Sequence, residues 1–288
     1  MPEPSSSPPP TTRYWAEVKG AGLSVPDDRP LADLTAELTR MLGDPDPQIR
    51  DGVAYPTLAT WIERGVYDDL LIGLGDGMAA GLTVGLGERD TDTVFRRSFS
   101  VLILTECIVR DTVRPLVTGS KIYEWGDRIS GWLLRERDIR GYVPGRGWAH
   151  ALAHGADALA ALGSSPHLGA NELTVLLDVI ADRILMPADI ALTHGEPDRL
   201  ALATVTILRR GLVPTTVVEP WISRVAAGAN RSYPGAGKDP YLRTGSAEAF
   251  LRALYLQLAL GARPLANRSD LLLAVVDGLR ASNHPYLA

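Results

Sequence analysis

The sequence predicts an all-α protein, built from helix pairs that stack side by side as a HEAT-like solenoid. Three observations carry this prediction. Apolar residues recur at helical spacing in almost every segment of the 288 residues, short Gly, Pro and Asp breaks separate these segments, and no segment shows the alternation of a half-buried strand. Because no strict internal period is visible, a compact irregular helical bundle is the second interpretation.

The first helices are expected in the N-terminal part of the chain. The apolar residues between Leu31 and Leu42 recur at helical spacing and stop before Gly43, and a second apolar set runs from Ile49 to Ile62. The Asp-Pro break between the two sets, followed by an Arg-Asp pair, is typical of a HEAT-type repeat. Such a helix pair cannot bury its apolar faces alone, so we expect it to stack on its neighbours.

The remaining segments are also expected to be helical. Residues 70–86 are apolar but rich in glycine, which costs about 1 kcal/mol per interior position relative to alanine. Residues 92–113 show a strong amphipathic pattern, with Thr91 or Asp92 as the cap. Further helices are expected at about 120–136, 148–162, 170–186, 198–211, 214–228, 246–261 and 268–282.

Composition indicates one structured domain and a tail. Residues 13–288 are expected to form a single α-helical repeat-like domain, and the Pro- and Ser-rich residues 1–12 a disordered tail. The single cysteine, Cys107, excludes a disulfide framework and a multi-cysteine zinc site. The chain shows no secretory signal and no run of the roughly 18 apolar residues that cross a bilayer. These features predict a cytoplasmic protein.

The charge balance argues against a nucleic-acid partner. Lys and Arg number 29 and Asp and Glu number 34, which gives a net charge of −5. Proteins that bind nucleic acids usually present a basic surface to the phosphate backbone. A membrane partner is not expected either, since no segment is apolar for long enough. The partners that stay open are a small anionic molecule and a peptide or protein segment.

The stretch from residue 135 to residue 168 concentrates the candidate site residues. A loop of sequence GYVPGRG leads into the helix expected from residue 148. His150 and His154 are four residues apart and Asp157 follows three later, so one face of that helix would carry all three. The candidate ligand-binding residues around the loop are Asp138, Arg140, Arg146 and Trp148.

One long signature lies in the same part of the chain. It consists of Trp132, Glu136, the run DIRGYV at 138–143 and the run GWAHALAHGAD at 147–157. This signature resembles the bacterial family catalogued as domain of unknown function 2785, most strongly over about 100–210. The resemblance implies a mostly helical, HEAT-like protein. It supplies no established reaction, so the chemistry has to follow from the residues.

One interpretation of the site is a metal centre. His150 and His154 would bind a divalent Zn, Fe or Mn ion, with Asp157 as a third or supporting ligand. The remaining ligand would be Asp138, Glu172 or His194. The protein would then be a metal-assisted hydrolase or a peptide-modifying enzyme, with His150, His154 and Asp157 as its catalytic residues.

A second interpretation is an anion site. The Gly-rich loop leads into a helix N-terminus, where free N–H groups and the helix dipole favour negative charge. Arg140 and Arg146 would add contacts to a phosphate or carboxylate, and His150 would donate or shuttle a proton. The protein would then be a cytoplasmic binding protein whose central groove recognises a small anionic ligand or an acidic or C-terminal peptide segment. This is the preferred function.

A third interpretation assigns the same residues to the fold alone. Arg140 would pair with Asp138 or Asp157 and hold the loop against the helix. The imidazoles and Trp148 would fill space between helices, the usual role of a helical aromatic residue. The sequence alone leaves open whether the protein is an enzyme.

Overall fold

A computed structural model gives the chain an all-α fold, as the sequence predicts. It describes residues 10–229, 239, 241–283 and 287. Within this part, twelve helices have nine or more residues, and the short elements are α3 (Pro47–Ile49), the π-helical turn η1 (Arg50–Ala54) and the 3-10 turn η2 (Asp68–Leu70). The long helices are α1 (Pro10–Gly20), α2 (Leu31–Met41), α4 (Tyr55–Glu63), α5 (Leu71–Gly81), α6 (Thr93–Val113), α7 (Gly119–Arg135), α8 (Ala151–Ser164), α9 (Ala170–Leu185), α10 (Glu196–Arg209), α11 (Thr215–Gly228), α12 (Tyr241–Leu260) and α13 (Arg268–Ser282).

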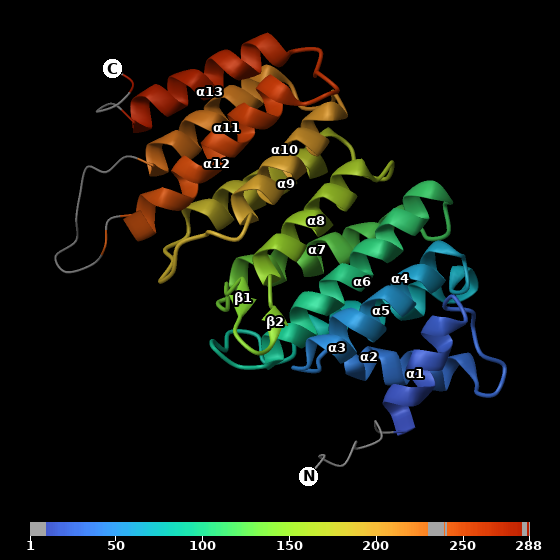
Figure 1. Cartoon of the computed structure of the whole chain (residues 1–288). Helices are drawn as coiled ribbons and strands as arrows, with labels where there is room; N and C mark the ends of the chain where they lie inside the picture. Colours follow the sequence, from blue (N-terminus) through green and yellow to red (C-terminus); the bar gives the residue numbers. More distant parts are fainter. Residues whose placement is uncertain (1–9, 230–238, 240, 284–286, 288) are drawn as a thin grey trace.

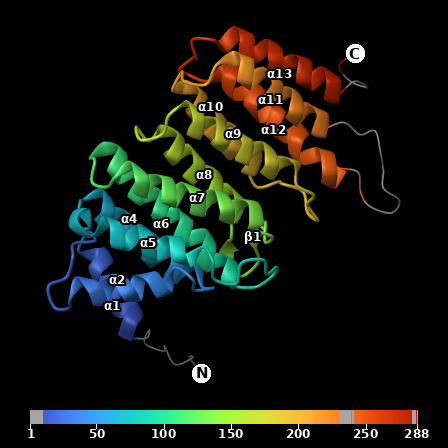
Figure 2. The same cartoon turned by 180° about the vertical axis from the view of Figure 1, so that it is seen from behind.

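The helices pack in chain order from one end of the molecule to the other. From α4 onward, each even-numbered helix packs on the next even-numbered one, and each odd-numbered helix from α5 to α13 packs on the next odd-numbered one. Helix pairs such as α5 with α6, α7 with α8 and α12 with α13 pack across the two rows. The colours in Figure 1 and Figure 2 therefore run in sequence order between the two ends of the molecule.

One hydrophobic core runs through the described chain, from Trp15 in α1 to Val275 in α13. It contains five of the six tryptophans; the sixth, Trp148, is 42% exposed. No helix in the described ranges is both long and apolar enough to cross a bilayer. The amphipathic periodicity of the sequence is thus used for burial between helices.

The structure corrects several expected boundaries. Helix α1 begins at Pro10, so the tail boundary expected after residue 12 falls inside a helix, and residues 1–9 lie outside the described part. Helix α5 ends at Gly81 rather than near residue 86, since Gly85 and Gly87 have positive φ and break the helix.

A short hairpin stands where the sequence predicts no strand. Strands β1 (Tyr142–Val143) and β2 (Gly147–Trp148) pair antiparallel between α7 and α8. As a result α8 begins at Ala151 instead of residue 148. The expectation that the chain contains helices and no paired strand is therefore wrong for these few residues, which carry much of the candidate site.

Candidate functional site

The hairpin brings the chain in extended form up to the start of α8. Its ladder continues beyond the strands, because the backbone N–H of His150 donates to the carbonyl of Arg140 at 3.1 Å. Gly147 has φ +74°, and a Cβ there would lie 3.0 Å from the side chain of Pro47. Glycine is therefore required where the hairpin approaches the N-terminal part of the chain.

A buried arginine fastens the hairpin to that N-terminal part. Arg50 is fully buried, and its guanidinium donates to the carbonyls of Asp44 and Arg146, both at 2.8 Å. The same guanidinium lies over the rings of Phe95 and Phe99, 4.1 and 4.8 Å from their centroids. Charge and packing together hold the hairpin at a fixed place over α6.

His150 is the most constrained residue of the site. It precedes α8 with φ 50° and ψ 29°, a left-handed conformation that is costly for a residue with a Cβ, and its side chain makes no capping hydrogen bond. Its imidazole stacks on the indole of Trp148 with centroids 4.2 Å apart, and no residue in the described part of the chain forms a hydrogen bond with its buried Nε2. Burial first, then the charges of Arg199 and His194, lower its pKa to about 4, so the ring is neutral at pH 7.

The left-handed turn at His150 overturns the expectation that His150 and His154 share one helical face. Only His154 lies within α8; the hairpin ladder keeps His150 out of the helix. The two rings instead meet edge to face, with centroids 5.8 Å apart.

The hydrogen bonds of His154 fix its tautomer. Ser98 Oγ donates to the carbonyl of Ala149, so it accepts from His154 Nδ1 at 2.8 Å. The carbonyl of Ser98, which can only accept, lies 3.3 Å from the same nitrogen. The proton therefore sits on Nδ1 and the lone pair on Nε2. Burial lowers the pKa of this imidazole to about 3.

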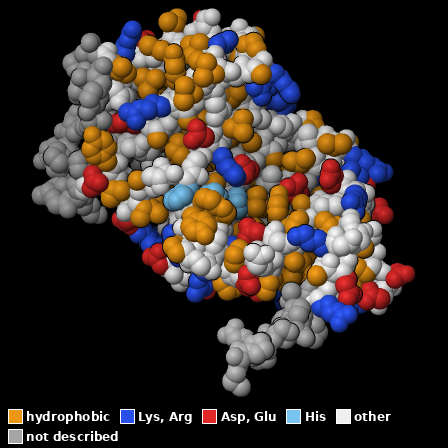
Figure 3. All heavy atoms as spheres, viewed as in Figure 1, with side chains coloured by type: hydrophobic (Ala, Val, Ile, Leu, Met, Phe, Trp, Pro, Cys, Tyr) orange, Lys and Arg blue, Asp and Glu red, His pale blue; other side chains and the backbone are white. Residues whose placement is uncertain are grey.

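The loop before α10 completes an aromatic group that we call the imidazole–indole cluster. Its members are Tyr142, Trp148, His150, His154 and His194. The rings of Tyr142 and His194 meet that of Trp148 at 5.1 and 5.8 Å. A Cβ on Gly141 would lie 2.4 Å from the His194 ring, so this close approach needs glycine. Figure 3 shows histidine side chains together in the middle of the face viewed, beside hydrophobic side chains.

Two polar pairs lie beside the cluster. Asp157 of α8 binds Arg199 of α10, and Glu106 of α6 accepts from the hydroxyl of Tyr55 of α4 at 3.0 Å. Burial raises the pKa of both carboxyl groups, and Glu106 raises that of Asp157 further by repulsion. One pair thus connects α4 with α6, and the other connects α8 with α10.

The arginines of the loop do not converge on the imidazoles. Arg140 binds Asp138 through Nε at 2.8 Å and Nη2 at 2.6 Å, as one interpretation of the sequence expected. Arg146 binds Asp92 on the surface. The expected meeting of both guanidiniums with His150 is therefore wrong, because each has a carboxylate partner elsewhere.

The expected metal ligands also have other partners. Among the residues that the structure describes, no three His, Cys, Asp or Glu side chains are arranged to hold a metal ion. His154 uses Nδ1 for Ser98, and Asp157 binds Arg199. Of the other expected ligands, Glu172 accepts from the Gly169 N–H at the start of α9, and only His194 reaches the cluster.

Sequence reasoning missed the residues that surround the cluster, which are Arg50, Tyr55, Ser98, Glu106 and Arg199. Their partners lie 42 to 96 residues away along the chain. No local pattern signals a contact between neighbouring helices at such a separation. The one usable signal is a charged residue on an otherwise apolar helix face, as at Glu106.

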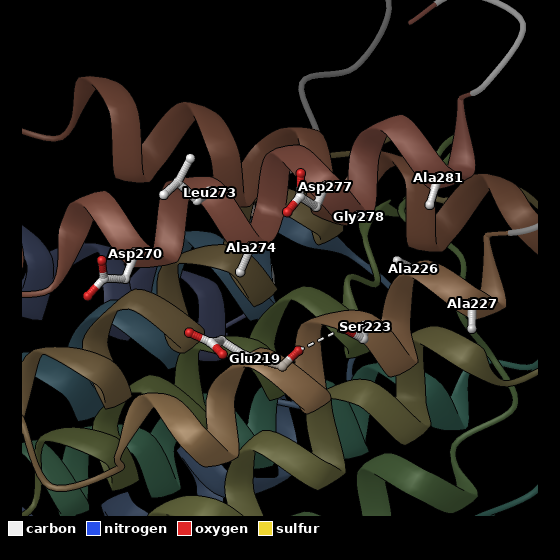
Figure 4. A pocket seen from close by; sticks show the side chains of 10 residues that line it. All are labelled: Glu219, Ser223, Ala226, Ala227, Asp270, Leu273, Ala274, Asp277, Gly278 and Ala281. Carbon is white, nitrogen blue, oxygen red and sulfur yellow. Dashed lines mark hydrogen bonds between the residues drawn. The ribbon is translucent and has the colours of Figure 1, made fainter. Parts of the chain in front are cut away.

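A separate groove of about 680 Å³ lies between α11 and α13. Figure 4 shows Ala274 among the carboxylates of Glu219, Asp270 and Asp277, and Ala226, Ala227 and Ala281 at the other end of the groove. It contains none of the residues singled out from the sequence.

Comparison with known proteins agrees with the resemblance seen in the sequence. The model of a family described as protein of unknown function (DUF2785) matches residues 82–256, which is more than half of the chain. No curated protein and no solved structure matches the chain. The matched region contains the hairpin, all of the imidazole–indole cluster and the Asp157–Arg199 pair. The chain therefore belongs to the DUF2785 family.

Proposed function

We propose that this protein is a cytoplasmic binding protein that takes an anionic group, a carboxylate or a phosphate, at the imidazole–indole cluster. The observation that carries the proposal is His150, which combines a left-handed backbone, a buried unpartnered Nε2 and a ring stacked on an exposed indole. Strain and an unsatisfied buried nitrogen each cost stability, and both concentrate at binding sites. A ligand that bonds to Nε2 would recover part of that cost.

The charges around the cluster favour an anion. Arg199 acts on both imidazoles and Arg50 acts on His154, and each cation lowers the pKa of the ring it acts on. No carboxylate is among the groups that shift the pKa of His150. Although Arg199 and Arg50 also pair with Asp157 and Asp51, these neutral rings respond to the two cations, which favours a negative group beside them. Proton uptake by His150 would strengthen the attraction.

The arrangement of helices supports a ligand longer than a single ion. In our proposal the two rows of helices form a HEAT-like solenoid, and one row carries the cluster and its polar pairs. An acidic or C-terminal peptide segment would place its carboxylate at His150 and run across α8 and α10. Asp157 and Arg199 are 32% and 40% exposed, so both are accessible to such a segment.

A metal-assisted hydrolase has less support. It needs His150, His154 and Asp157 around one ion, whereas His150 lies outside the helix and Asp157 binds Arg199. Metal analysis of the purified protein separates the two functions. Near-stoichiometric Zn, Fe or Mn that disappears in His150→Ala would favour the hydrolase over the binding protein.

Trp148 provides the direct test, because it is the exposed tryptophan of the six. Its fluorescence is followed during titration with acetate, with phosphate, and with a short peptide that ends in a free carboxylate or in an amide. We expect a saturable change with the free carboxylate and none with the amide.

The matched variants are His150→Asn and His167→Asn. Asparagine tolerates the left-handed conformation, so His150→Asn removes the imidazole without adding backbone strain. His167 pairs with Asp111 at 3.1 Å outside the cluster and serves as the control. The response should vanish in His150→Asn and persist in His167→Asn. An equal response in the two variants would refute the proposal.

A further inference from the structure

A second cavity, of about 350 Å³, lies between the segment 136–140 and the segment 186–190. Arg183 of α9 lines it together with charged and apolar residues of both segments. Its apolar lining comes from Ile139, Met186 and Ile190. None of the rings of the imidazole–indole cluster lines this cavity.

Arg183 is the distinctive residue of the cavity. It is only 9% exposed, and its Nη1 donates to the carbonyl of Glu136 at 3.2 Å and lies 3.4 Å from the sulfur of Met186. No described residue accepts a hydrogen bond from its buried Nε or from its Nη2. One whole edge of a buried guanidinium is therefore without an acceptor.

Other arginines of the chain show what this edge binds. Arg97, Arg110 and Arg140 each hold a carboxylate through the pair Nε and Nη2, at 2.5–2.9 Å. This fork matches the two oxygens of a carboxylate. Arg183 has the same fork without a carboxylate on it, and it lines the cavity.

The carboxylates nearby cannot serve Arg183. Both oxygens of Glu136 accept from Arg97, and Trp132 Nε1 and the Asp138 N–H also donate to them. The side chain of Asp138 binds Arg140. Two further carboxylates line the cavity: Asp189 binds Arg89, and Asp90 lies 3.7 Å from Arg140. Because Glu136 pairs with Arg97 and Asp138 pairs with Arg140, no described carboxylate forms a hydrogen bond with the charge of Arg183. Burial lowers the pKa of Arg183, and the negative charge of Glu136 opposes this only in part.

We propose that this cavity binds the monocarboxylate of a small organic acid, with its oxygens on Arg183 Nε and Nη2 and its aliphatic part against Ile139, Met186 and Ile190. A single negative charge matches that of the Arg183 guanidinium. A doubly charged phosphate would exceed it and would lie close to the carboxylates of Glu136 and Asp138. The site goes beyond the function proposed above, since different residues carry it.

The test uses propionate and butyrate as probes, at constant ionic strength set with sodium chloride, and the melting temperature as the readout. It is made in the His150→Asn background, so that binding at the imidazole–indole cluster does not contribute. We expect a saturable rise in melting temperature, because a ligand that binds only the folded state stabilises it. Sulfate and phosphate should give no saturable rise.

Two substitutions then assign the response to Arg183. Arg183→Met keeps the unbranched stem of the side chain as far as the position of Nε and removes the unbalanced charge, so the protein without ligand should melt no earlier than its parent. The carboxylate response should be lost in this variant. Arg183→Lys keeps the charge without the fork and should lose most of the response, and it serves as the test if Arg183→Met does not fold.

Three outcomes would overturn the inference. These are a carboxylate response that persists without Arg183, an equal response to phosphate or sulfate, and no response to either carboxylate in His150→Asn. If the cavity at Arg183 binds no carboxylate, the fluorescence response of Trp148 to a ligand at His150 is still expected. The two proposals can therefore be refuted independently.

Discussion

Glu136 forms hydrogen bonds to several helices around the site, and its replacement by glutamine should lower the stability of the protein strongly. Its carboxylate accepts from Arg97 Nε and Nη2, Trp132 Nε1 and the Asp138 N–H, while its carbonyl accepts from Arg183. The Arg97 and Glu136 side chains are 0% and 1% exposed. In Glu136→Gln the guanidinium of Arg97 stays buried without its counter-charge.

Breaking a buried ion pair on one side costs about 3–5 kcal/mol of the free energy of unfolding. For a chain of this size, that corresponds to a fall in melting temperature of roughly 6–20 °C. Urea and thermal unfolding of Glu136→Gln measure the loss. The control is Asp178→Asn, which breaks the Arg224–Asp178 pair, whose side chains are 44% and 55% exposed, and should cost no more than about 1 kcal/mol. A Glu136→Gln protein as stable as the control would refute the reasoning.

Three further predictions concern the cluster. An anion bound at His150 raises the pKa of the imidazole above the value of about 4 that it has without ligand. The affinity for the anion should therefore increase as the pH falls from the pKa of the bound form to that of the free form, by up to about tenfold per pH unit. Titrations in His150→Asn should be independent of pH over that range. The pKa of His154 is about 3 in the folded protein and 6.5 in an exposed histidine, so between these values the unfolded chain binds a proton that the folded chain does not. The free energy of unfolding should therefore decrease as the pH falls from about 6.5 towards 3. A urea midpoint that stays constant over this range would contradict the burial of His154. Gly141→Ala places a Cβ 2.4 Å from the His194 ring and 2.7 Å from the His194 Cβ, which no side-chain rotation can move away. The backbone must therefore shift, so stability should fall by about 1–3 kcal/mol and the Trp148 titration should weaken several-fold. Unchanged binding would mean that His194 is not part of the site.

The helices were predictable because burial imposes a period on the sequence. The strongly periodic segment 92–113 matches α6 almost residue for residue, and the segment 268–282 coincides with α13. Helix α1 was not predicted, because its Pro-rich start is typical of a tail. Local sequence decides a helix best where the apolar stripe is long.

Some members of the imidazole–indole cluster were predictable from the sequence, but its geometry was not. The sequence identified Trp148, His150 and His154, which meet in the cluster. The spacing of four residues between His150 and His154 predicts that both lie on one face of a helix. In the structure, the hairpin keeps His150 out of the helix, and Arg50, 96 residues before Arg146, holds that hairpin. Hydrogen bonds between residues so far apart in the sequence override the helical preference of the local segment. The spacing of residues along the chain does not reveal such bonds.

The tether formed by Arg50 also bears on where the working unit of this protein begins. The family match starts at residue 82, yet the guanidinium that holds the Arg146 carbonyl belongs to residue 50 and is itself held by the carbonyl of Asp44. A fragment trimmed to the matched region would keep every ring of the cluster and lose the support beneath its hairpin. The smallest piece of chain able to present His150 as it stands here therefore starts before residue 44.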